Sequence, residues 1–107
     1  DQVLIQVSEI VKRSIRESDI AARWGGEELA VYLPLMNLEQ AHKVAERIRN
    51  RIFNETNPRI TISSGIADWR QDDSRVSLDL LFHNADMALY EAKNAGKNMI
   101  RRSARPT

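Results

Sequence analysis

Hydrophobic residues recur every three or four positions in three stretches of the chain, which is the spacing of an amphipathic α-helix. The first stretch covers about residues 2–17, the second follows Asn37, and the third follows Ser77. Asn37 and Gln40 form a capping box, and Ser77 is a residue type that often starts a helix. Gly96 is well placed to end the third helix.

Shorter patterns between these helices predict strands. Apolar side chains alternate over residues 20–24, and residues 29–33 form an apolar run that ends at a proline, so together they predict a hairpin. Residues 59–67 are rich in β-branched side chains and contain a glycine, which indicates a buried strand with another element close to its backbone. Residues 98–101 predict a last short strand.

The predicted order, α-β-β-α-β-α-β, favours an α+β domain with a mainly antiparallel sheet and helices on its faces. A length of 107 residues with 42% hydrophobic and 29% charged residues fits a single domain over residues 1–107. The chain has no cysteine, which excludes disulfides and thiolate metal sites and suits a cytoplasmic location. A net charge of +1 argues against binding of a nucleic acid polymer, so an anionic ligand would be held locally.

The predicted hairpin turn carries the sequence Gly-Gly-Glu-Glu at residues 25–28. Gly25 and Gly26 suit a tight turn because they accept positive φ angles without a Cβ clash. Glu27 and Glu28 gain nothing from being adjacent, since like charges repel. They are either a solvated tip or oxygen ligands for a hard cation such as Mg²⁺, which commonly bridges carboxylates to substrate phosphates.

Two lysines, Lys93 and Lys97, flank the predicted end of the third helix. If the last strand folds back beside the hairpin, both could face the same phosphates. The alternative is that they are solvated cations that complement the C-terminus of the helix.

The sequence resembles the GGDEF domains, the diguanylate cyclases. Five segments carry the resemblance, in the family's order and spacing: residues 23–29, 45–49, 61–67, 85–93 and 96–98. The resemblance implies the ferredoxin-like palm fold of nucleotidyl cyclases. It also implies condensation of two GTP molecules into cyclic di-GMP with release of pyrophosphate, with Mg²⁺ or Mn²⁺ as cofactor and a homodimer as the catalytic unit.

The resemblance assigns roles at the turn. Glu27 matches the carboxylate that binds metal and takes the proton of the 3′-hydroxyl, and Glu28 matches the acidic residue that supports it. Gly25 and Gly26 would form the turn near the nucleotide. Asp1 falls where the family has an aspartate on the guanine edge, although it could also be only a helix cap.

Outside the turn, the resemblance places Lys93 and Lys97 on the β- and γ-phosphates. Lys97 stands where arginine is commoner, which keeps the charge but loses the bidentate fork. Leu29 replaces the usual phenylalanine, a change in packing.

A second constellation, Arg16 and Asp19, resembles the Arg-x-x-Asp site at which the family's enzymes are inhibited by their product. Arg47 matches a further arginine that cyclic di-GMP engages. Guanidinium groups suit phosphate and the guanine edge, and aspartate can accept from guanine donors. The alternative is an ordinary ion pair between residues i and i+3 at a helix end.

The family's first strand, with a second metal-binding aspartate and a guanine-binding asparagine, has no match here. We therefore expect a GGDEF domain without its N-terminal portion, inactive by itself, in a parent chain with an upstream sensory domain and compatible with a membrane anchor. Three hypotheses follow: an active cyclase, a catalytically silent module that binds GTP or cyclic di-GMP, and an unrelated ferredoxin-like interaction domain. The first is favoured by the intact Gly-Gly-Glu-Glu sequence and both lysines.

Overall fold

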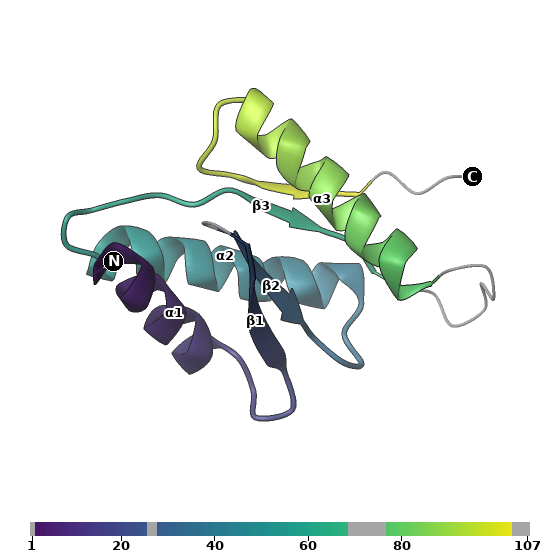
Figure 1. The fold of residues 1–107 in the computed structure, drawn as a ribbon, viewed down its shortest axis with the longest axis horizontal. Helices are drawn as coiled ribbons and strands as arrows, with labels where there is room; N and C mark the ends of the chain where they lie inside the picture. Colours follow the sequence, from purple (N-terminus) through teal and green to yellow (C-terminus); the bar gives the residue numbers. More distant parts are fainter. Residues whose placement is uncertain (1, 26–27, 69–76, 104–107) are drawn as a thin grey trace.

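The structure is a computed structural model that describes residues 2–25, 28–68 and 77–103. The predicted order of helices and strands is confirmed (Figure 1). The elements are α1 (Gln2–Ser14), β1 (Ile20–Gly25), β2 (Glu28–Tyr32), α2 (Leu38–Glu55), β3 (Ser64–Ile66), α3 (Leu78–Asn94) and β4 (Ile100–Arg102). Within the described ranges, none of the three helices combines the length and the apolar character needed to cross a membrane.

The helix ends follow the predicted capping residues. At the start of α2, Asn37 Oδ1 accepts from the Gln40 backbone N–H at 2.8 Å, and Gln40 Oε1 accepts from the Asn37 N–H at 2.9 Å. Ser77 caps α3 through a bond from the Leu80 N–H, and Gly96 follows the end of this helix with a φ of 126°. These contacts satisfy backbone groups that a helix end leaves without partners.

Helix α1 ends three residues earlier than the hydrophobic pattern predicts. Its last residue is Ser14, whose hydroxyl donates to the Ile10 carbonyl at 2.6 Å. The chain then forms a turn closed by a hydrogen bond from the Asp19 N–H to the Arg16 carbonyl. The apolar spacing continues to Ile15, which packs on the core although it lies outside the helix.

The strands form two separate pairs. β1 and β2 make the predicted antiparallel hairpin, with Ala21 opposite Val31. β3 and β4 pair in parallel, and β3 covers three residues of the longer predicted strand. A parallel pair is expected here because α3 connects these two strands as a crossover helix. Thus the antiparallel arrangement predicted for the sheet holds for the hairpin, and the β3–β4 pair differs from it.

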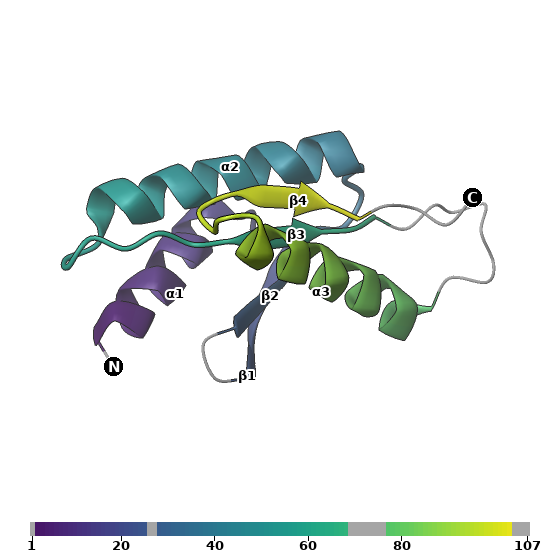
Figure 2. The same ribbon diagram turned by 90° about the horizontal axis from the view of Figure 1, so that it is seen from above.

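The core forms where α1, the hairpin and the segment before β3 meet one face of α2. Figure 2 shows α1, the hairpin and the β3–β4 pair all on the same side of α2, with β3 and β4 between α2 and α3. Ile52 is fully buried, and the buried residues around it are Val7, Ile10, Val11, Val44 and Ile48. Leu29 packs against this cluster from β2.

Gly65 in β3 sets how closely α3 approaches the sheet. A Cβ atom at this position would lie 2.2 Å from the Ala85 carbonyl oxygen and 2.2 Å from the Leu89 backbone nitrogen. Both atoms belong to the backbone of α3, so they cannot move aside without moving the helix. The predicted close approach at this glycine is confirmed, and it places the end of α3 that carries Lys93.

We therefore expect Gly65→Ala to lower the free energy of unfolding by about 1–3 kcal/mol, because the added methyl group overpacks a contact between two backbones. Urea unfolding of the two proteins measures this difference. Ser64→Ala is the matched control, since the Ser64 backbone N–H keeps its bond to the Met99 carbonyl whatever its side chain. Equal unfolding midpoints for Gly65→Ala and the control would contradict this account of the packing.

Candidate functional site

The hairpin turn is the first part of the candidate site. Gly25 is the last residue of β1 and is paired with Glu28, the first residue of β2, next to an irregularity in the register after Arg23. Glu28 is therefore anchored by strand pairing, and its side chain is half-buried. The other residues predicted for this part of the site, Asp1, Gly26 and Glu27, lie outside the described residues.

Lys93 and Lys97 come from the end of α3 and from the loop that follows it. Lys93 lies in the last turn of α3, and Lys97 lies two residues beyond the C-cap residue Ala95, with a φ of 63°. Both side chains are exposed, and neither makes a hydrogen bond or ion pair with another residue in the described part of the chain. Both are therefore available to an anionic ligand.

The hairpin end and the loop after α3 are separate in the structure. β4 pairs with β3 and not with a strand of the hairpin, so it does not bring the lysines beside the turn by strand pairing. In Figure 1 the hairpin strands lie below β3 and the loop between α3 and β4 lies above it, and Figure 2 also shows the hairpin below β3. A ligand shared by Glu28 and the lysines would have to span this separation.

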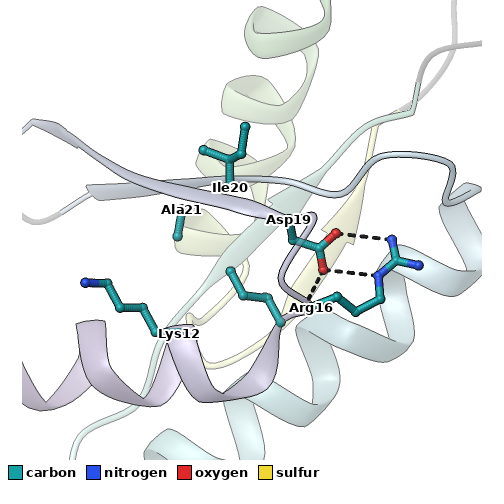
Figure 3. Close-up of a pocket in the computed structure, with 6 residues that line it drawn as sticks. Lys12, Arg16, Asp19, Ile20 and Ala21 are labelled. Atoms are coloured by element: carbon teal, nitrogen blue, oxygen red, sulfur yellow. Dashed lines mark hydrogen bonds and ion pairs between the residues drawn. The ribbon is translucent and has the colours of Figure 1, made fainter.

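The Arg16–Asp19 segment folds into a compact turn, shown in Figure 3. The Asp19 carboxylate accepts three hydrogen bonds from Arg16: from its backbone N–H at 2.7 Å, from Nη2 at 3.1 Å and from Nε at 3.4 Å. A further bond joins Arg16 Nη2 to the Pro34 carbonyl at 2.9 Å. The ion pair expected from the i, i+3 spacing is therefore present, and it fixes the direction of the guanidinium group.

The two members of this pair differ in exposure. The Arg16 side chain is 52% exposed, whereas the Asp19 side chain is 0% exposed. Burial by itself raises the pKa of Asp19, but the hydrogen bonds and the positive charge of Arg16 outweigh it and hold the pKa below its ordinary value of 3.8. In this conformation Arg16 can contact a ligand, and Asp19 acts by orienting Arg16.

Arg47 lies beside the same turn. Its Nη2 donates to the Ser14 carbonyl at 2.6 Å, and Arg51 Nη1 donates to the Ser14 hydroxyl at 3.0 Å. Two arginines of α2 thus hold the last turn of α1, where carbonyl groups lack partners within the helix. The three residues predicted for the inhibitory site, Arg16, Asp19 and Arg47, are brought to one end of α1.

A pocket adjoins this turn and includes a residue that the sequence interpretation missed. Lys12, Ile15, Arg16, Asp19, Ile20 and Ala21 line it (Figure 3). Lys12 precedes Arg16 by four residues, a spacing that places side chains on the same face of a helix and could have identified it. In Figure 3 the Arg16 guanidinium points toward Asp19 and away from Lys12 and the exposed Ile20, which line the other end of the pocket.

The donor set at the turn suits a hard cation. Among the described residues, no group of three or more histidine, cysteine, aspartate or glutamate side chains is placed to hold a metal ion. Mg²⁺ commonly needs only one or two carboxylates, because substrate phosphates and water supply its other oxygen ligands. Two adjacent glutamates at a hairpin turn fit that requirement.

The α+β fold and the Gly-Gly-Glu-Glu sequence at the hairpin turn agree with a family of known proteins. The chain belongs to the GGDEF family, whose model, described as "Diguanylate cyclase, GGDEF domain", matches residues 1–99.

Curated relatives match over the same region. YtrP of Bacillus subtilis, described as an uncharacterized protein, is 45% identical over 100 residues, which are 94% of this chain and 17% of that protein. Diguanylate cyclase DgcM of Escherichia coli K12 is 37% identical over 103 residues, 94% of this chain and 24% of that protein. The chain thus spans about a quarter or less of the length of these two relatives.

Solved structures share the fold. The active GGEEF domain of a diguanylate cyclase from Vibrio cholerae superposes with a TM-score of 0.88 at 27% identity, covering 99% of this chain and 69% of that one. The GGDEF domain of DgcB from Caulobacter crescentus, in complex with c-di-GMP, gives a TM-score of 0.84 at 28% identity, covering 94% of this chain and 63% of that one. The palm fold predicted from the resemblance is confirmed.

The lowered pKa of Asp19 predicts how stability depends on pH. A carboxyl group with a lowered pKa in the folded state stabilises the protein above its ordinary pKa, and this contribution disappears as the pH falls through the folded-state value. Asp19→Asn should therefore be less stable than the parent at pH 7, and the difference should shrink as the pH is lowered below 3.8.

Urea unfolding at a series of pH values measures the effect. Glu17→Gln is the matched control, because Glu17 is an exposed carboxylate in the same turn. A stability difference between Asp19→Asn and the parent that stays constant from pH 7 to pH 2 would show that the charge of Asp19 contributes nothing.

Proposed function

We propose that this chain is the catalytic region of a diguanylate cyclase that condenses two GTP molecules into cyclic di-GMP. The observation that carries the proposal is the Gly-Gly-Glu-Glu sequence at the β1–β2 turn of a GGDEF-family chain, with Glu28 opening β2 opposite Gly25. The Vibrio cholerae domain, described as an active GGEEF domain, supports a glutamate at the third signature position.

In the proposed reaction, each 3′-hydroxyl oxygen bonds to the α-phosphorus of the other GTP. The bond from that phosphorus to the bridging oxygen of the β-phosphate breaks, and pyrophosphate leaves. Glu27 accepts the hydroxyl proton, and Glu28 adds negative charge beside it. Mg²⁺ or Mn²⁺, when bound by these carboxylates and the phosphates, supplies positive charge for the transition state.

The two lysines complete the proposed GTP site. Lys93 and Lys97 would neutralise the β- and γ-phosphates, which together form the leaving pyrophosphate. Their exposed side chains, without partners among the described residues, are consistent with this role. One domain offers one such turn and hence one GTP, so the two phosphodiester bonds would form across a two-fold interface between two copies.

We also propose that cyclic di-GMP inhibits the enzyme at the end of α1. Arg16 offers a half-exposed guanidinium oriented by Asp19, and Arg47 lies beside the same turn. The solved structure of DgcB in complex with c-di-GMP supports binding of this product by a relative. Bound product would hold domains in an arrangement in which their GTP sites cannot meet.

The second candidate function is a catalytically silent module that binds GTP or cyclic di-GMP. The observation that favours it is the intact Arg16–Asp19 pair, which needs no catalytic turn in order to bind product. This module would bind cyclic di-GMP and form none from GTP.

Glu27→Gln tests the catalytic proposal. The change keeps the shape of the side chain but removes the charge and the proton acceptor, so the full-length protein should lose several orders of magnitude in turnover and should remain folded. Chromatography of the products formed from GTP and Mg²⁺ measures this. Glu55→Gln, which removes an exposed negative charge on α2, should keep the activity of the parent.

Near-normal turnover by Glu27→Gln would refute the catalytic role of this residue. A parent protein that forms no cyclic di-GMP but binds it tightly would support the silent module instead.

Arg16→Ala tests the inhibitory site. Loss of a charged fork, whose hydrogen bonds are each worth about 1.5–3 kcal/mol, should weaken binding of cyclic di-GMP by one to two orders of magnitude. The variant should keep its initial rate for longer as product accumulates, with little change in GTP affinity. Arg13→Ala is the matched control, because Arg13 is an exposed arginine of α1 paired with Glu55 and does not line the pocket.

Calorimetry with cyclic di-GMP and progress curves provide the two measurements. Unchanged product affinity together with unchanged inhibition in Arg16→Ala would leave this pair as a helix-end ion pair only.

A further inference from the structure

The loop that carries Lys97 has an unusual backbone. Gly96, Lys97 and Asn98 have φ angles of 126°, 63° and 48°, so three consecutive residues occupy the left-handed region. Glycine enters this region freely and asparagine tolerates it, but a lysine rarely adopts it. A conformation of this kind persists only when surrounding contacts hold it in place.

Three elements hold this loop. The Lys97 backbone N–H donates to the Ala92 carbonyl of α3 at 3.0 Å, which ties the loop to the helix that precedes it. The Asn98 N–H donates to the Ser63 hydroxyl at 3.2 Å, just before β3. From α2, Arg49 Nη1 donates to the Asn98 side-chain oxygen at 3.0 Å. The backbone of Lys97 is thus fixed on both sides, while its ammonium group has no partner in the described part of the chain.

The arginine in this arrangement is itself oriented. Arg49 Nη2 pairs with Glu46, one turn earlier on α2, and the Arg49 side chain is only 23% exposed. One nitrogen of the Arg49 guanidinium contacts Glu46 and another contacts Asn98, so Arg49 links α2 to the loop through two defined contacts. An arginine that served only as a surface charge would not need two defined partners.

We propose that Arg49 and Asn98 are positioning residues that set the place of Lys97 for the terminal phosphates of the nucleotide. This inference rests on the proposed function, in which Lys97 binds those phosphates. Lysine carries a single charge without the planar fork of an arginine, so its contact with a phosphate depends more on where the backbone places it. Arg49 supplies that placement through the side chain of Asn98.

The test measures binding of a non-reactive GTP analogue, with a methylene group between the α- and β-phosphates, and of GMP, which lacks the phosphates that Lys97 would contact. Calorimetry compares the full-length parent with Arg49→Ala, Lys97→Ala and the double variant. We expect Arg49→Ala to weaken binding of the analogue about tenfold and to leave binding of GMP unchanged. In the Lys97→Ala background the Arg49 change should have no further effect, because the residue it positions is gone.

Two further variants separate positioning from general stability. Arg102→Ala is the matched control: Arg102, the last residue of β4, also joins its strand to α2, but through Glu39 at 2.7 Å and His42 at 3.1 Å and not through Asn98. It should bind the analogue like the parent. Asn98→Gly keeps the left-handed backbone and removes only the acceptor for Arg49, so it should reproduce the loss seen in Arg49→Ala even if that variant folds poorly.

The outcomes are distinguishable. If the parent binds the analogue no better than GMP, the proposed function and the role of Lys97 both fail. If the parent prefers the analogue but Arg49→Ala and Asn98→Gly bind it equally well, only the positioning role fails. Losses from Arg49→Ala and Lys97→Ala that add in the double variant would also overturn it, because Arg49 would then act independently of Lys97.

Discussion

The structure depends on burial of the apolar face of α2. Val44, Ile48 and Ile52 lie on this face, and α1, the hairpin and the segment leading to β3 all pack on it. Each strand pair has only two strands, and an isolated pair of that size is marginally stable in water. Removal of these side chains from water therefore supports the hairpin that carries the turn, and it holds the segment that leads into β3.

The arginines of α2 connect the same helix to neighbouring elements. Arg47 and Arg51 contact Ser14 in the last turn of α1, two residues before Arg16. Arg49 contacts the loop that carries Lys97. Guanidinium groups suit this task because their several donors can satisfy carbonyl or amide oxygens on a neighbouring element. The helix that forms the core therefore also sets the geometry of the proposed inhibitory site and of the proposed phosphate-binding loop.

The Arg16–Asp19 pair shows how a structural contact can also orient a side chain for the proposed binding of a ligand. The spacing alone allowed either an ion pair or a ligand site. In the structure Asp19 is buried and satisfies its oxygens with Arg16, while Arg16 keeps half of its side chain in solvent. The cost of burying a carboxylate is offset by these bonds, which lower its pKa, and the result is a guanidinium with a fixed direction.

The sequence by itself determined the element order, the capping residues of α2 and α3, the hairpin and the close approach at Gly65, because each depends on a local pattern or on a missing side chain. It also identified the family. Only the tertiary structure decided that α1 stops at Ser14, that β4 pairs in parallel with β3, and that Arg49 reaches Asn98 across 49 residues of sequence. These features depend on contacts between segments far apart in the chain, and no local spacing of residues encodes which segments meet.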